Sequence, residues 1–176
     1  VSEKMANVMK AFKYVFVLAS ATDIERLASI KNAALEANKT LYVCSKFIAS
    51  TMKFFTERES EQTHGLFSFS PRMLRLNGLE RMKKKGFVLV VGTSQISRVE
   101  ELLKELPIEE TLLVYSSWEG YYTIPEQVDA NPIYKKFRKL FCNVIDIHTS
   151  GHADKTTIGK VIDVIKPQKN IFIHKE

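Results

Sequence analysis

Short apolar runs alternate with segments of helical periodicity along the chain. Each run is rich in Val, Ile, Leu, Phe or Tyr and stands between polar turns, which is typical of a strand buried in a sheet. Strands are therefore predicted at residues 14–18, 40–44, 87–91, 111–115, 143–147 and 171–173. Between them, apolar residues recur three or four positions apart, the spacing that places side chains on one helix face.

The clearest helix follows the first strand. Thr22-x-x-Glu25 is a capping box, and the apolar face continues through Leu27, Ile30 and Ala34. Residues 57–85 predict a loop and then a helix that starts at Pro71 and stops at Gly86. Other helices are expected at residues 46–57, 96–106 and 158–165, and one that starts at residue 125 or 132 and runs to 141.

This alternation of strand and helix favours an α/β fold, a mostly parallel, doubly wound sheet with helices on both faces. Ligands of such sheets gather outside the carboxyl ends of the strands. Functional residues are therefore expected at positions 19–22, 92–95, 116–120 and 148–154, and at His174.

The composition fits one ordinary domain, because 176 residues with 45% hydrophobic content suffice for a real core. The apolar runs are too short to cross a bilayer, so we expect a soluble protein with no membrane partner. Cys44 and Cys142 form no closely spaced pair and are expected to be small buried hydrophobes of a cytoplasmic protein. The formal charge of +6, from 26 Lys and Arg against 20 Asp and Glu, favours a polyanionic partner such as RNA.

The densest polar cluster runs from His148 to Asp154 and contains Thr149, Ser150, Gly151 and His152. Hydroxyls and a glycine before a helix suit an anionic ligand such as phosphate. A tight loop in which Asp154 caps the helix is the alternative. The last histidine, His174, stands at the end of the sixth predicted strand, where it fits either a structural role or a metal ligand.

Three of these segments together resemble a known family. The segment 147–154, then Lys166-Pro167, then Ile173-His174-Lys175-Glu176 are similar to the closing motifs of the β-CASP group of metallo-β-lactamase-fold nucleases, ribonuclease J among them. Lys175 stands where that group usually has glycine. Residues 17–27 look like the stretch that opens the family's inserted domain.

The resemblance implies roles for particular residues. It makes His152 the catalytic histidine that contacts the scissile phosphate and assists the leaving group, and it makes His174 a ligand of one of two divalent metals, Zn or Mn. It implies single-stranded RNA as the substrate. The RNA or its phosphates would contact His148, Thr149, Ser150, Gly151, Ser20, Arg26, Thr93, Ser94 and Gln95.

The chain departs from the family in the metal motif. None of its four histidines lies in a His-x-His-x-Asp-His arrangement, and one ligand cannot hold two metals. We therefore expect residues 1–146 to be the β-CASP-like domain and residues 147–176 to return to a metallo-β-lactamase domain that this chain lacks. The isolated chain is then expected to be inactive, with no metal bound.

A second departure leaves alternatives open. Residues 92–96 differ from the ribonuclease J turn that holds a 5′-phosphate, so Thr93 and Ser94 fit helix capping as well as substrate contact. A non-catalytic RNA- or nucleotide-binding module, an oligomerisation module such as a homodimer, and a hydrolase with a non-RNA substrate remain open. Trp118, Tyr121 and Tyr122 suit either base stacking or packing against a partner.

Overall fold

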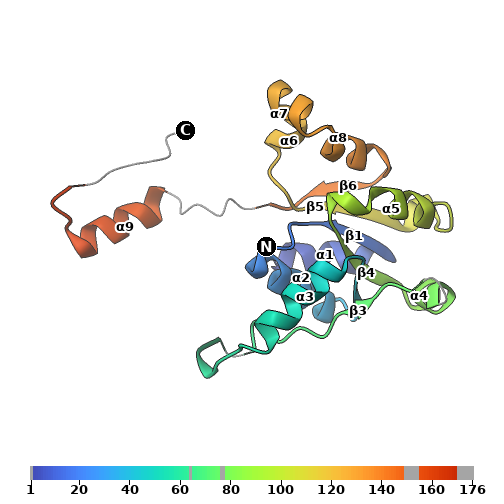
Figure 1. Cartoon of the computed structure of the whole chain (residues 1–176), viewed down its shortest axis with the longest axis horizontal. Helices are drawn as coiled ribbons and strands as arrows, with labels where there is room; N and C mark the ends of the chain where they lie inside the picture. Colours follow the sequence, from blue (N-terminus) through green and yellow to red (C-terminus); the bar gives the residue numbers. More distant parts are fainter. Residues whose placement is uncertain (1, 64, 76–77, 149–154, 170–176) are drawn as a thin grey trace.

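The computed structural model describes residues 2–63, 65–75, 78–148 and 155–169. Its core is a six-stranded, all-parallel sheet with the order β3-β2-β4-β1-β5-β6 (Figure 1). The strands are β1 (Tyr14–Leu18), β2 (Thr40–Val43), β3 (Arg72–Met73), β4 (Phe87–Val91), β5 (Thr111–Tyr115) and β6 (Val144–Asp146).

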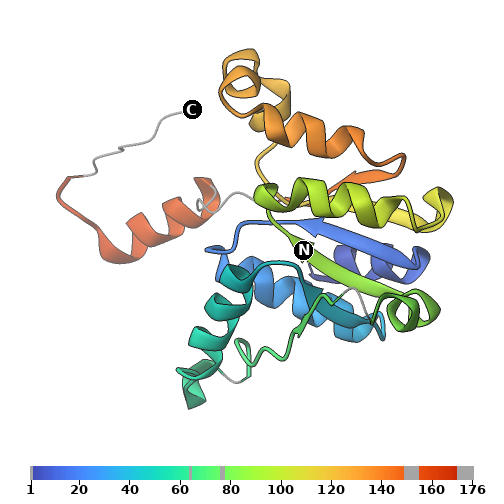
Figure 2. The same ribbon diagram turned by 45° about the vertical axis from the view of Figure 1, so that its right-hand side comes forward.

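Helices cover both faces of this sheet, which confirms the predicted α/β class. They are α1 (Ser2–Ala11), α2 (Ile24–Glu36), α3 (Lys46–Thr56), α4 (Leu79–Lys85), α5 (Ile96–Leu103), α6 (Gly120–Thr123), α7 (Pro125–Ala130), α8 (Pro132–Lys139) and α9 (Lys155–Ile165). Figure 2 shows α9 apart from the layered body, and its Val161, Val164 and Ile165 are exposed.

Two apolar cores sandwich the sheet, because successive strand residues point to opposite faces. On one face Val15 and Val17 pack with α1, α2 and α3, and on the other Phe16 and Leu18 pack with α4, α5 and α8. The central strands β1, β4 and β5 are buried at every position. Their uninterrupted apolar runs match strands covered on both faces.

The structure corrects several boundaries. Residues 72–73 form edge strand β3 instead of a helix from Pro71, because Tyr42 and Val43 of β2 pair with Arg72 and Met73. The N-cap of α2 is Asp23, whose carboxylate accepts the Arg26 N–H at 3.0 Å, so Thr22 does not cap this helix. Both candidate starts of the later helix are used, by α7 and α8. The strand predicted at 171–173 lies outside the described residues.

Further differences concern the first helix and the cysteines. Helix α1, which the apolar pattern does not predict, buries Met5, Ala6 and Met9 completely. Cys44 is buried as expected, whereas Cys142 is exposed because it follows α8 in the bend before β6. Within the described parts of the chain, no helix reaches the length and apolar character that a bilayer crossing requires.

Candidate functional site

A cavity of about 250 Å³ lies at the carboxyl edge of the sheet. Hydroxyl side chains line it from four neighbouring strand ends: Ser20 follows β1, Ser45 follows β2, Thr93 and Ser94 follow β4, and Ser117 follows β5. The chain leaves β1 toward β2 on one side and β4 toward β5 on the other, which makes this point the topological switch of the sheet. Open α/β sheets bind ligands at that position.

The loop after β4 is held by its own side chains. The Gln95 carbonyl oxygen accepts the Gly92 N–H at 2.8 Å, and the Gln95 amide donates to the Ser94 hydroxyl. Residues 93–95 form a short 3₁₀ turn that leads into α5. Gln95 therefore caps the loop, and among the described residues no hydrogen bond engages the Thr93 hydroxyl, which remains available to a ligand.

The loops after β1 and β2 are ordered in the same local way. The hydroxyls of Ser20 and Thr22 are hydrogen bonded at 2.8 Å. Ser45 caps α3, because its hydroxyl accepts the Phe47 N–H at 3.1 Å. A short side chain that is hydrogen bonded within its own loop has little conformational freedom. The hydroxyls are therefore positioned before any ligand binds.

Tyr134 of α8 forms another wall of the cavity. Its ring stacks on Tyr121, with centroids 4.4 Å apart and planes 11° apart, and Trp118 meets Tyr121 edge-on at 5.4 Å. Burial raises the pKa of the Tyr134 phenol, with a smaller contribution from Tyr121, so its O–H remains a donor at neutral pH. The wall is thus rigid, aromatic and able to donate one hydrogen bond.

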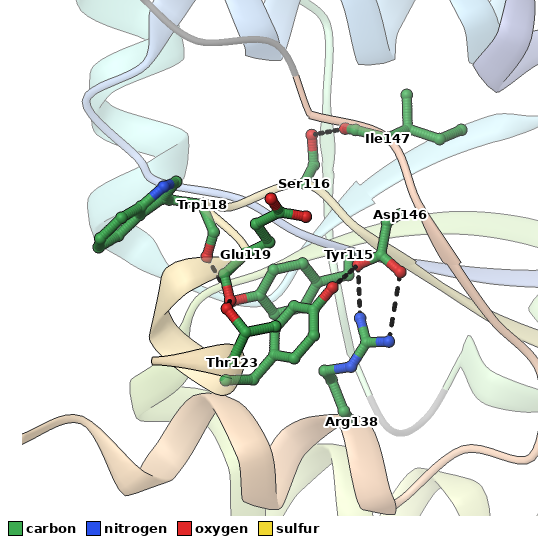
Figure 3. Close-up of polar contacts among 9 residues, drawn as sticks. Tyr115, Ser116, Trp118, Glu119, Thr123, Arg138, Asp146 and Ile147 are labelled. Atoms are coloured by element: carbon green, nitrogen blue, oxygen red, sulfur yellow. Dashed lines mark hydrogen bonds and ion pairs between the residues drawn. The ribbon is translucent and has the colours of Figure 1, made fainter. Parts of the chain in front are cut away.

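Tyr122 does not belong to this wall. Its hydroxyl bonds to Asp146 at 3.0 Å, and the Arg138 guanidinium lies 3.9 Å from its ring centre. Figure 3 shows Arg138 held by Asp146, and the Trp118 ring pointing away from that pair. Tyr122 is therefore engaged by contacts within this chain, whereas Trp118 is 43% exposed.

A second polar group lies beyond the end of β6. The Ser116 hydroxyl donates to the Ile147 carbonyl at 2.7 Å and ties the ends of β5 and β6 together (Figure 3), which positions His148. Burial lowers the pKa of His148, and the charge of Arg26 adds to this, while Asp23 opposes it. The imidazole is thus neutral near pH 7 and can donate or accept a hydrogen bond.

The predicted site residues separate into three groups. Ser20, Thr93, Ser94 and Gln95 line the cavity together. Arg26 does not line it: its side chain, in the first turn of α2, is 6% exposed and lies 3.6 Å from the Asp23 carboxylate. His148 lies near Arg26, and the remaining predicted residues fall outside the described residues: Thr149, Ser150, Gly151, His152 and His174.

Sequence reasoning missed Ser45, Phe47 and Tyr134 as cavity residues. The rule that ligands gather at strand ends already points to Ser45, because it follows the second predicted strand. Ser117 lies within the segment 116–120 that the rule selected. No local signal marks Phe47 or Tyr134, since each is one of two or more aromatic residues in an amphipathic helix.

The metal centre implied by the resemblance does not fit the described residues. Within them, no group of three or more His, Cys, Asp or Glu side chains is arranged to hold a metal ion. The one metal ligand that the resemblance implies, His174, lies outside the described part of the chain.

A second cavity, of about 270 Å³, lies at the opposite edge of the sheet. Its lining is mainly apolar and includes Leu103, Leu106, Ile108 and Phe141. It lies at the amino ends of the strands and gathers few polar groups. The cavity at the carboxyl edge is therefore the better candidate for a specific polar ligand.

Comparison with known proteins adds no assignment. No protein-family pattern matches the chain, and neither does any curated protein sequence.

Proposed function

We propose that this chain is the β-CASP portion of a ribonuclease J-like, metal-dependent hydrolase that cleaves RNA phosphodiester bonds in the cytoplasm. In this proposal the cavity at the carboxyl edge holds part of a single-stranded RNA. A metallo-β-lactamase domain of the same parent protein supplies most ligands of the two Zn or Mn ions. The resemblance assigns His174 as a further ligand and His152 to the scissile phosphate.

The observation that best supports an RNA site is the convergence of hydroxyl side chains from four strand ends. Ser20, Ser45, Thr93 and Ser94 offer neutral donors and acceptors to phosphate and ribose oxygens. Tyr134 adds an aromatic wall beside them. Single-stranded nucleic acids are commonly bound by such a combination of polar contacts and aromatic surfaces.

Basic residues beside the cavity support the same substrate. Helix α8, which carries Tyr134, also presents exposed Lys135 and Lys139. Because no charged side chain among the described residues lines the cavity itself, long-range attraction of the RNA backbone falls to such surrounding cations. The net charge of +6 acts in the same direction.

The test is binding of a fluorescent, 5′-monophosphorylated single-stranded RNA, followed by anisotropy. We expect saturable binding that weakens as salt rises. Combined Thr93→Val and Ser94→Ala substitution should weaken it about tenfold, because two hydrogen bonds to the strand are lost. Ser68→Ala, an exposed serine outside the cavity, is the matched control and should bind like the unaltered chain.

Two results would overturn the proposal. Absence of RNA binding at low salt would show that this chain has no RNA-binding site. If the double variant and the Ser68→Ala control bind the RNA with equal affinity, the RNA binds elsewhere on the surface. Addition of Mn²⁺ or Zn²⁺ should produce no cleavage by this chain, and cleavage that a chelator abolishes would contradict the assignment of the metal site to another domain.

A further inference from the structure

Phe47 is an aromatic residue at the cavity, and its side chain does not pack into the core. Its side chain is 63% exposed at the start of α3, and it lines the cavity at the carboxyl edge. Among the described residues, no other ring or cation pairs with it. An exposed hydrophobic residue alone needs no explanation, but one that lines a polar cavity is placed to contact its ligand.

Phe54, on the same helix, provides a contrast. It is 49% exposed, but the Arg58 guanidinium covers its ring at 3.7 Å and Phe55 contacts it edge-on at 5.5 Å. Phe54 does not line the cavity. The two phenylalanines therefore differ in the property that matters for binding, which is a free ring face at the site.

The backbone of Phe47 is fixed at the rim. Ser45 caps α3 by accepting the Phe47 N–H, and the Phe47 carbonyl accepts the Thr51 hydroxyl at 3.1 Å. The adjacent Ile48 is buried and anchors the first turn in the core. An aromatic side chain on such a turn has few torsions to restrict when it stacks on a ligand.

The chemistry around Phe47 selects the ligand class. Hydroxyls of Ser20, Thr93 and Ser94 suit the ribose and phosphate oxygens of a nucleotide, and a free aromatic ring suits its base. We propose that Phe47 stacks on one nucleobase of the bound single strand, which rests on the function proposed above. Every base has an aromatic face, so this contact is tolerant of sequence.

The experiment compares two RNAs of equal length, one with bases throughout and one with abasic sites. Phe47→Leu should weaken binding of the normal RNA about tenfold, because leucine keeps the apolar surface and loses the aromatic face. Phe54→Leu is the matched control and should bind normally. With the abasic RNA, the unaltered chain and Phe47→Leu should bind equally. Since Phe47 is exposed, its substitution should leave the circular dichroism spectrum and melting temperature unchanged.

A direct signal comes from Phe47→Trp in a Trp118→Phe background. Because the chain has one tryptophan, the indole introduced at position 47 is then the sole tryptophan fluorophore. Normal RNA should quench its fluorescence, and abasic RNA should not. If Phe47→Leu binds normal RNA as the unaltered chain does, or loses affinity for both RNAs equally, base stacking by Phe47 is wrong while the RNA site stands. If the unaltered chain binds neither RNA, both proposals fail.

Discussion

Arg138 and Asp146 form a two-point ion pair that joins α8 to β6. One guanidinium nitrogen lies 2.5 Å from one carboxylate oxygen and a second lies 3.2 Å from the other, and Tyr122 donates to the same carboxylate. The pair holds α8, and with it the Tyr134 wall of the cavity, against the edge of the sheet. It therefore links the stability of that edge to the shape of the candidate site.

Arg138→Gln should lower the free energy of unfolding by about 1 kcal/mol, through loss of a two-point pair and of the cation–π contact with Tyr122. Urea unfolding measures this. Lys136→Gln is the control, because the Lys136–Glu100 pair is a single contact at 3.4 Å in which the Lys136 side chain is 60% exposed. It should change stability by less than about 0.5 kcal/mol. Equal losses in the two variants would show that the second contact adds nothing.

Gly86, between α4 and β4, should not tolerate a side chain. Its φ is +72°, and a Cβ would lie 2.6 Å from the Lys13 carbonyl oxygen, which also accepts the Phe87 N–H at 3.1 Å. Gly86→Ala should therefore cost about 1–3 kcal/mol in thermal or urea unfolding. Gly78→Ala, where no atom of the described residues lies within 4 Å of an added Cβ, should stay within about 0.5 kcal/mol. A neutral Gly86→Ala would mean that the α4–β4 turn adjusts freely.

Lys39 should make stability depend on alkaline pH. Its ammonium donates to the carbonyls of Phe12 and Lys13, and burial lowers its pKa to about 8. In the unfolded chain lysine keeps its ordinary pKa near 10.5. Between about pH 8 and 10.5 the unfolded chain therefore holds a proton on Lys39 that the folded chain has lost. The free energy of unfolding consequently rises with pH over this range. Below pH 8 both states are protonated and the contribution is at its minimum.

Lys39→Met should remove that rise. The stability of the variant relative to the unaltered chain should therefore be less favourable at pH 10 than at pH 7, as measured by urea unfolding at the two pH values. Other titrating groups are common to both proteins and cancel in the difference. Parallel pH profiles would show that Lys39 keeps its ordinary pKa in the folded chain.

The two histidines that the resemblance singles out should behave differently in a parent protein that carries the metallo-β-lactamase domain. His152→Ala should reduce RNA turnover greatly and leave the metal content nearly unchanged, because its implied role is at the scissile phosphate. His174→Ala should lower the metal content, as measured by elemental analysis. Unaltered turnover in the first variant, or full metal retention in the second, would contradict the respective role.

The sequence by itself determined the centre of the sheet. The apolar runs at β1, β4 and β5 predict these strands at their observed bounds, because a strand buried on both faces carries its signal in its own residues. It also selected Ser20, Thr93 and Ser94, because parallel strand ends share one edge.

The tertiary structure decided those features that the local sequence pattern does not encode. Two residues, Arg72 and Met73, become β3 only because the edge of β2 offers them hydrogen bonds. Arg26 is a buried residue of α2 and does not line the cavity, since its orientation depends on the packing of that helix. Phe47 and Tyr134 belong to helices far apart in the sequence, and the folded sheet alone places them on one cavity.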